Sequence, residues 1–194
     1  MATQSGTPGF PGKQFQVAGH QLHLVHAPND RLEAVLRLIA VAERSIQVFF
    51  YMFADDSVGC DVRTALVEAA KRGVQVQLII DSFGSAAISD RFFDELTDAG
   101  GRYHCFSTRK GLGYIIRNHQ KILIADGTHA LVGGFNITDQ YFGRSGDADW
   151  EDLGIIITGP EVPRLARYFD EMAGASVDGK VRYRKIRSII QHWQ

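Results

Sequence analysis

The first half of the chain alternates short apolar segments with longer amphipathic ones. The apolar segments are 45–53 (SIQVFFYMF), 74–81 (VQVQLIID) and 102–106 (RYHCF). Short apolar runs bounded by turn residues are typical of strands that are covered on both faces, and helical periodicity between such runs indicates strand–helix–strand units. This rhythm predicts an α/β fold with a mixed, mostly parallel central sheet flanked by helices.

The amphipathic segments supply the expected helices. Segment 30–45 begins with Asp30 and Glu33 at capping-box spacing, and further helices are expected at 61–73, ending at Gly73, and at 89–101. The first helix has an apolar stripe made of Leu32, Val35, Leu36 and Ile39. These helices are expected to cover the sheet.

The second half of the chain has a different pattern. Asp126-Gly127 joins two apolar strands and is a strong hairpin signal, and a further strand is expected within 150–160. A helix over 161–174 turns four apolar residues to the core: Val162, Leu165, Phe169 and Met172. We expect a flexible lead at 1–14, one domain at 15–176, and a basic amphipathic tail or linker at 177–194.

Composition narrows the class of protein. The chain has 194 residues with 21 Lys plus Arg and 22 Asp plus Glu, a balance that disfavours a dedicated nucleic-acid binder. Cys60 and Cys105 match no metal or disulfide spacing and fit a reducing compartment. With no signal peptide and no apolar run near ~18 residues, we expect a cytoplasmic protein, with any membrane contact peripheral and on the inner face. The histidines of 20–26 do not share one strand face and are not expected to bind metal.

The hairpin carries the residues that could take part in a chemical reaction. Side chains alternate along a strand, so His119 and Lys121 share one face, and the glycine pair Gly133-Gly134 with Asn136 returns beside them. Small residues there would let a ligand approach the backbone N–H groups closely. An imidazole can attack phosphorus, and a fixed ammonium with amide donors can stabilise the charge on the non-bridging oxygens. The set suits a phosphodiester, and neither a metal nor a cofactor is expected.

The spacing His-x-Lys-x4-Asp-x6-Gly-Gly-x-Asn resembles the signature of the phospholipase D superfamily. The flanking segments 54–85 and 150–160 are similar to the bacterial cardiolipin synthase branch. The resemblance runs from about Phe15 to about Met172 and implies a single phospholipase D-like half-domain.

The resemblance also implies roles for individual residues. His119 would be the nucleophile that forms a phosphohistidine, while Lys121 and Asn136 hold the phosphate and Asp152 orients the histidine. Asp126 is expected to be structural, at a turn and strand end, with Gly133 and Gly134 in supporting positions. Glu151 and Asp147 are alternatives to Asp152. Glu151 and Trp150 are also candidates for contact with the substrate, although Trp150 could equally close the core.

The sequence departs from the family pattern in one respect, because cardiolipin synthases and most phospholipases D carry two such motifs and this chain has one. A homodimer could supply the second His119, the chain could be the first half of a longer enzyme, or it could be a degenerate binding module. The single-motif nucleases of the superfamily work as dimers.

Three functions follow from these alternatives. The leading one is phosphodiester transfer or hydrolysis on phospholipids, as in cardiolipin synthesis or phospholipase D action. The second is a dimeric, metal-independent endonuclease, which the near-neutral charge makes less favourable. The third is a non-catalytic module that binds lipid or a partner, with peripheral membrane contact through the tail, where Arg184, Lys185 and Arg187 lie off the apolar helical face.

Overall fold

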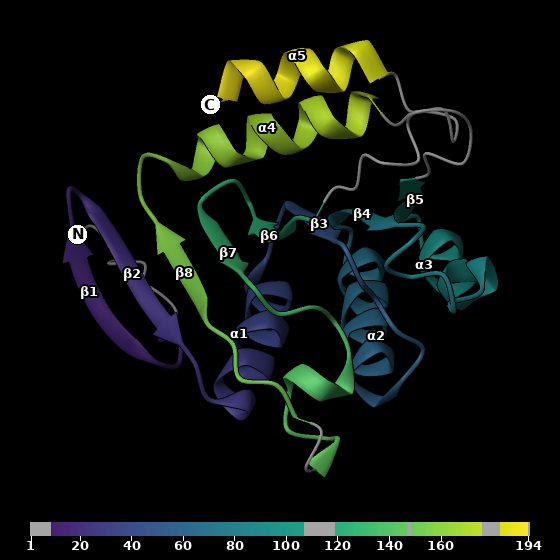
Figure 1. Cartoon of the computed structure of the whole chain (residues 1–194), viewed down its shortest axis with the longest axis horizontal. Helices are drawn as coiled ribbons and strands as arrows, with labels where there is room; N and C mark the ends of the chain where they lie inside the picture. Colours follow the sequence, from purple (N-terminus) through teal and green to yellow (C-terminus); the bar gives the residue numbers. More distant parts are fainter. Residues whose placement is uncertain (1–8, 107–118, 147–148, 176–182, 194) are drawn as a thin grey trace.

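The described residues of the computed structural model, 9–106, 119–146, 149–175 and 183–193, form an eight-stranded sheet between two helical layers (Figure 1). The strand order across the sheet is β1-β2-β8-β7-β6-β3-β4-β5. The strands are β1 (Lys13–Val17), β2 (His20–Val25), β3 (Ser45–Phe50), β4 (Gln75–Asp81), β5 (Arg102–Phe106), β6 (Lys121–Ala125), β7 (His129–Gly133) and β8 (Gly154–Thr158).

The sheet is mixed, as expected, but the prediction that it is mostly parallel was wrong. Only the pairs β3–β4 and β4–β5 are parallel. The other five neighbouring pairs are antiparallel. The strand–helix rhythm that favoured parallel pairing covers only β3 to β5, whereas the hairpins β1–β2 and β6–β7 contribute antiparallel strands and β8 enters between them.

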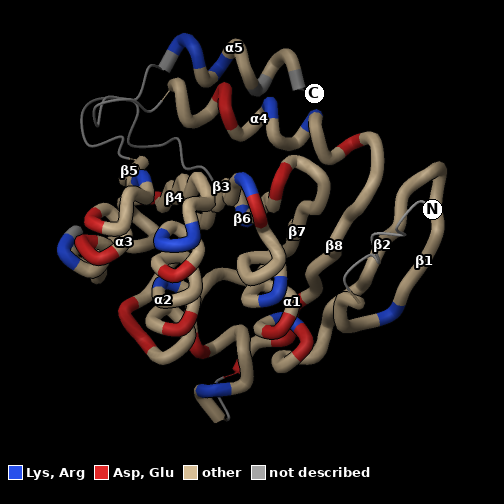
Figure 2. The backbone as a smooth tube through the Cα atoms, turned by 180° about the vertical axis from the view of Figure 1, so that it is seen from behind, with Lys and Arg blue, Asp and Glu red and all other residues tan. Residues whose placement is uncertain are grey.

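Helices cover both faces of the sheet. On one face lie α1 (Pro28–Val41), α2 (Ser57–Lys71) and the short pair η1 (Asp90–Phe93) and α3 (Asp94–Asp98). On the other lie α4 (Val162–Ala175) and α5 (Tyr183–Trp193), side by side (Figure 1). Acidic and basic residues are interspersed on α1 and α2, whereas α3 carries only acidic residues and α5 only basic ones (Figure 2).

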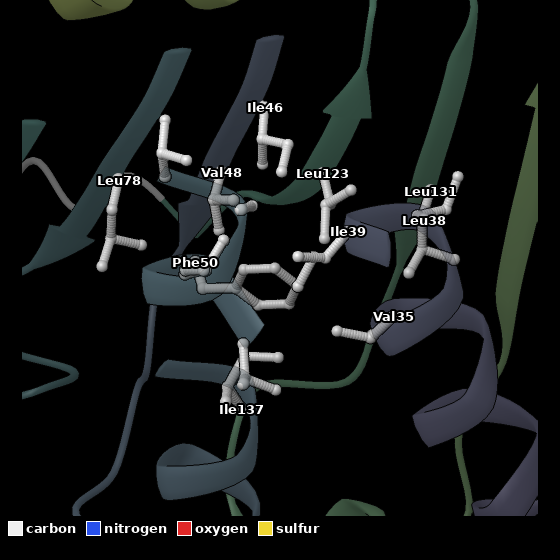
Figure 3. Close-up of a cluster of buried hydrophobic side chains, with 14 of the residues drawn as sticks. Val35, Leu38, Ile39, Ile46, Val48, Phe50, Leu78, Leu123, Leu131 and Ile137 are labelled. Carbon is white, nitrogen blue, oxygen red and sulfur yellow. The ribbon is translucent and has the colours of Figure 1, made fainter. Parts of the chain in front are cut away.

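The larger core lies between the sheet and the α1–α2 layer (Figure 3). Val48 of β3, Leu123 of β6 and Leu131 of β7 point toward Val35 and Ile39 of α1, and all five side chains are essentially inaccessible. Burial of each such aliphatic side chain stabilises the fold by about 1.5–3 kcal/mol. The core therefore fixes the central strands from which the candidate site projects.

The first helix differs from its prediction in two ways. It begins at Pro28, and its N-cap Ala27 makes no side-chain hydrogen bond, so the predicted capping box does not form. Proline is well suited to the first helical turn because its φ is already helical and its missing N–H needs no partner there. The buried stripe is also rotated from the predicted one, because Leu32 and Leu36 are only partly buried. The buried residues are Arg31, Ala34, Val35, Leu38 and Ile39.

The next two predicted helices have boundaries that differ in part from those in the structure. Helix α2 starts at Ser57, earlier than the expected residue 61, because the Asp56 carboxylate caps it by accepting from the N–H of Gly59 at 2.9 Å. Its end is confirmed, since Gly73 follows with a φ of +90°. The expected helix at 89–101 is divided into η1 and α3.

The outer helical layer follows the sequence pattern closely. In α4, Val162, Phe169 and Met172 are buried as predicted, and Leu165 is partly buried. Ile186 and Ile189 of α5 are buried in the same cluster. These two apolar side chains of α5 thus contact the protein itself. No helix in the described part of the chain is long and apolar enough to cross a bilayer.

Candidate active site

The β6–β7 hairpin determines which candidate residues meet. Ile122 lies opposite Val132, so the start of β6 is beside the end of β7. His119 and Lys121 therefore lie at the same end of the sheet as Gly134 and Asn136, which follow β7. The Asp126-Gly127 turn lies at the opposite end of the two strands.

His119 and Lys121 are in direct contact. The Lys121 ammonium lies 3.0 Å from His119 Nδ1 and 3.3 Å from Nε2, and it donates to the His119 carbonyl at 3.0 Å. Lys121 is buried, whereas His119 is exposed. The ring of Tyr51, directly after β3, lies 4.5 Å from the His119 ring centroid and 5.5 Å from the Lys121 ammonium. The cation is thus held against the imidazole on one side and an aromatic face on the other.

The environment favours the neutral form of His119. Although the residue is exposed, partial removal of the imidazole from water lowers the pKa of His119, and the positive charge of Lys121 lowers it further, while the negative charge of Asp81 acts in the opposite direction. Burial also lowers the pKa of Lys121, opposed by the charge of Asp152. A neutral imidazole beside an ammonium has the protonation state that a nucleophilic histidine needs.

Asn136 is fixed by hydrogen bonds at both ends of its amide. Its Oδ1 accepts from the N–H of Met52 at 3.0 Å, and its Nδ2 donates to the Tyr141 hydroxyl at 3.2 Å. Burial raises the pKa of Tyr141, so the hydroxyl stays protonated. Because Nδ2 carries two hydrogens, the amide can bond Tyr141 and still direct a donor at a phosphate oxygen.

The glycine pair has a different local role from the one expected. The N–H of Gly134 donates to the Leu153 carbonyl at 3.2 Å, so it is already used within the protein. A Cβ on Gly134 would lie 2.3 Å from the Asp152 Oδ1. On Gly133 it would lie 2.9 Å from the Leu153 carbonyl oxygen. The absent side chains therefore admit the 152–154 backbone and the Asp152 carboxylate rather than a ligand.

Asp152 lies close to the Lys121 side of the site. Its Oδ1 accepts from the N–H of Leu153 at 2.7 Å, and its charge acts on Lys121 and Tyr141. Among the described residues it makes no hydrogen bond to His119. The arrangement thus places the carboxylate where it can compensate the charge of Lys121.

The neighbours of Asp152 are arranged around the opening of the site. Trp150 is half exposed and packs edge-on against Tyr141, with ring centroids 5.0 Å apart. Glu151 is exposed. Asp147, the other candidate from this loop, lies outside the described residues.

Asp126 is remote from this group and organises the hairpin turn. Its carboxylate accepts from the N–H groups of Glu43, Arg44 and Ser45 at 3.0, 2.7 and 2.8 Å. Burial alone raises the pKa of Asp126, but these three donors and the Arg44 charge outweigh it and hold the pKa below its usual value. The contacts fasten the turn to the segment that enters β3.

Sequence reasoning missed four residues of the site region. Tyr51 and Asp81 follow or end apolar strands at the site end of the sheet, a position that could have singled them out. Tyr141 bonds Asn136, and Arg31 donates to the Asp152 carbonyl at 2.8 Å. Neither had a local signal, because each contact depends on the tertiary fold.

Metal-ligand geometry is not apparent in the described residues, which contain no group of three or more His, Cys, Asp or Glu side chains placed to hold an ion. Neither Cys60 nor Cys105 forms a disulfide in the described structure. The candidate site is therefore described by its own side chains: an imidazole, an ammonium, an amide and a carboxylate.

A mixed sheet between two helical layers, with a histidine–lysine pair and an asparagine at one end, defines an α/β protein of the phospholipase D-like class. Comparison with known families agrees. The chain belongs to the family described as "Cardiolipin synthase, PLD-like domain", whose model matches residues 35–173. Members of this superfamily are phosphatidyltransferases and phosphodiesterases.

Individual relatives support the same assignment. The chain is 32% identical over 165 residues to cardiolipin synthase A of Pseudomonas fluorescens, covering 82% of this chain and 34% of the relative. It is 35% identical over 145 residues to the major cardiolipin synthase of Bacillus subtilis, covering 72% and 30%. The chain thus spans about a third of the length of these curated relatives.

Solved structures show the same fold. The phospholipase D family member Nuc from Salmonella typhimurium superposes with a TM-score of 0.59 at 25% identity, covering 78% of this chain and 90% of that one. Phosphatidylserine synthase from Haemophilus influenzae gives a TM-score of 0.66 at 16% identity, covering 95% and 44%.

Proposed function

We propose that this chain carries the catalytic unit, residues 15–176, for phosphodiester transfer or hydrolysis on phospholipids through a covalent phosphohistidine at His119. The observation that carries the proposal is the 3.0 Å contact between the Lys121 ammonium and the imidazole of His119. It joins a nucleophile and a phosphate-binding cation at one point.

The reaction would proceed in two displacements. A nitrogen of the neutral His119 imidazole attacks phosphorus, the P–N bond forms, and the bond to the leaving alcohol oxygen breaks. Phosphate oxygens replace His119 as acceptors of Lys121, and Asn136 donates to them. An acceptor alcohol or water then attacks phosphorus and releases the imidazole. Transfer to an alcohol gives a new phosphodiester, and transfer to water gives hydrolysis.

The first displacement needs a proton for the leaving alkoxide. A general acid on the opposite side of phosphorus supplies it in such reactions, and its conjugate base then takes the proton of the acceptor alcohol or water in the second displacement. We infer that the acid is a second motif histidine, provided either by a second copy of this chain or by a second half-domain. An isologous dimer would place two copies of His119 in one site.

Phospholipid is the favoured substrate because the matching family model and the curated relatives are those of cardiolipin synthases. Peripheral contact with an anionic membrane is part of this proposal. The apolar residues Ile186 and Ile189 of α5 are buried, while Arg184, Lys185 and Arg187 are exposed. The helix would therefore bind lipid head groups by charge, on the inner face of the membrane, rather than by insertion.

A dimeric endonuclease is the second candidate. One observation favours it: the chain covers 90% of Nuc and, at 17% identity with a TM-score of 0.61, 96% of NucT from Helicobacter pylori, so single domains of this size exist as whole solved chains. The near-neutral charge of this chain weighs against tight binding to a phosphate backbone.

The test uses vesicles of phosphatidylglycerol in the presence of a chelator. Wild-type protein is expected to release glycerol and form cardiolipin or phosphatidic acid. His119→Asn should abolish turnover, whereas His26→Asn, which changes an exposed histidine on another segment, should leave it unchanged.

Parallel assays with single-stranded DNA separate the two candidates. Cleavage of DNA without lipid turnover would replace the first proposal by the second. Vesicle binding without turnover of either substrate, and unaffected by His119→Asn, would contradict both and indicate a non-catalytic module.

A further inference from the structure

Arg31 is a buried cation on the apolar face of α1. Its side chain is only 1% exposed, among aliphatic neighbours of the main core. The guanidinium donates to the carbonyls of Asp152 at 2.8 Å and Trp150 at 3.2 Å, and its Nε is buried without a partner among the described atoms. Burying a charge is costly unless it is well compensated, so this position calls for a specific role.

The segment held by Arg31 is otherwise weakly fastened. Residues 149–153 contain no helix or strand. Apart from Arg31, their backbone is held by the N–H groups of Asp149 and Trp150, which donate to the carbonyls of Gly146 and Gln140 at 3.1 and 2.7 Å, and by the Leu153 carbonyl, which accepts from the Gly134 N–H at 3.2 Å. Two donors from one rigid guanidinium therefore bridge the stretch immediately before Asp152.

That stretch determines where the Asp152 carboxylate lies. The carboxylate fits against the bare Cα of Gly134 with no spare room, and its charge acts on Lys121. A displacement of the Asp152 backbone would move the carboxylate away from Lys121 or into β7. Arg31 is 121 residues away in sequence, yet it contacts the residue next to the site.

Nearby negative charges compensate the buried positive charge of Arg31. Burial lowers the pKa of Arg31, and the negative charges of Asp152, Asp149 and Glu151 act in the opposite direction. The guanidinium also lies 6.0 Å from the centroid of the Phe135 ring, which follows Gly134. Arg31 thus lies between Phe135, which follows β7, and the segment that contains Asp152.

We propose that Arg31 is a positioning residue that clamps the carbonyls of Trp150 and Asp152, and thereby keeps the Asp152 carboxylate in its place against Gly134, at the site end of the sheet, for binding of the substrate phosphate. This inference rests on the proposed function. Lysine cannot replace the clamp fully, because an ammonium on a flexible stem does not bridge two carbonyls as a planar guanidinium does.

The test compares Arg31→Lys and Arg31→Met with a matched control, Arg63→Lys. Arg63 on α2 also donates to a carbonyl (that of Phe92, at 3.3 Å), lies 4.4 Å from an aromatic ring centroid, and has a buried Nε without a partner. It fastens η1 rather than the site. The control therefore reproduces the loss of a partly buried arginine that donates to a carbonyl, without the loss of the clamp.

Three readouts are needed. Inorganic phosphate binding, followed through the His119 ring signals by NMR, should weaken roughly tenfold in Arg31→Lys and more in Arg31→Met, as expected for a loosened site. The kcat on phosphatidylglycerol should fall in the same order. Hydrogen exchange at the Gly134 and Leu153 amides should accelerate, and Arg63→Lys should change none of these values.

A double mutant identifies the residue through which Arg31 acts. With Asp152→Asn present, Arg31→Lys should have little further effect on phosphate binding, because coupled residues are not additive. Full additivity, or amide exchange equal to that of the Arg63 control, would overturn the inference. Wild-type protein that neither binds phosphate nor turns over lipid would instead contradict the proposed function, while amide exchange would still decide whether Arg31 holds the segment.

Discussion

At the scale of single residues, the site depends on how Lys121 and His119 influence each other. A buried ammonium in contact with an imidazole disfavours a second positive charge on the ring. The pKa of His119 is accordingly lowered, by burial first and by Lys121 second. The neutral, nucleophilic form therefore persists to lower pH than in an ordinary histidine with a pKa near 6.5.

Replacing Lys121 should reverse part of the lowering of the His119 pKa. In Lys121→Met the pKa of His119 is expected to rise, because one of the two lowering influences is removed while Asp81 still favours the protonated form. An NMR titration of the His119 ring protons measures the change. The matched control is Lys71→Met, which removes an exposed lysine on α2.

The same change has a kinetic consequence. If the neutral imidazole is the nucleophile, the acid limb of the wild-type pH–rate profile should lie below pH 6.5. Any residual activity of Lys121→Met should have its acid limb at higher pH. A His119 pKa that stays the same or falls in this variant would contradict the proposed electrostatic coupling.

At the scale of elements, the β6–β7 hairpin is the unit that delivers the site, and Asp126 fastens it to the start of β3. Asp126 has a φ of +56°, a conformation that aspartate and asparagine tolerate better than most residues. Its carboxylate satisfies three backbone N–H groups. The hairpin is therefore held at the end away from the site, leaving the site end free for chemistry.

Asp126→Ala should destabilise the protein by about 2 kcal/mol or more, because three N–H donors lose their acceptor. Asp126→Asn should cost less, since its amide oxygen still accepts and its backbone preference is retained. Urea unfolding measures both, and Asp98→Ala, at an exposed position at the end of α3, is the control. A loss no larger than in the control would show that the contacts are not needed.

The contribution of the Asp126 carboxylate to the free energy of unfolding should depend on pH in a definite direction. The folded-state pKa of Asp126 is lowered, so its stabilisation is complete above the ordinary value of 3.8 and is lost as the pH falls through the folded-state value. The difference in unfolding free energy between the wild type and Asp126→Asn should therefore shrink in acid.

At the scale of the whole molecule, the described site contains one motif histidine while the proposed reaction uses two. A second copy of the chain can provide the other only if the site ends of two sheets face each other. Three of the large exposed apolar side chains, Phe83, Trp150 and Leu153, lie within two residues of Asp81 or Asp152. This end of the sheet is therefore suited to being covered.

Light scattering across a range of concentrations should show a species of twice the 21.5 kDa of the chain. In an equal mixture of wild type and His119→Asn that exchanges subunits, a site with two histidines predicts about a quarter of the full activity, because only wild-type pairs are complete. Independent sites predict about half. A strict monomer would mean that the second half must come from another chain or segment.

Local patterns in the sequence predicted most of the elements and singled out the candidate site residues of the hairpin. Periodicity predicted the buried face of α4, and the dipeptide Asp126-Gly127 predicted the hairpin. Because a hairpin joins neighbouring strands, it also predicted that His119, Lys121 and Asn136 would meet. These features depend on residues less than about twenty positions apart.

Only the tertiary structure decided the rest. The order of the strands, the fit of Asp152 against Gly134, and the burial of Arg31 depend on segments separated by up to 121 residues. Such contacts leave no periodic trace, because each element is compatible with several partners until packing and hydrogen bonding select one. The sequence by itself therefore determined which side chains are proposed to carry the chemistry, because they lie on one hairpin, and the fold determined which neighbours set their positions and charges.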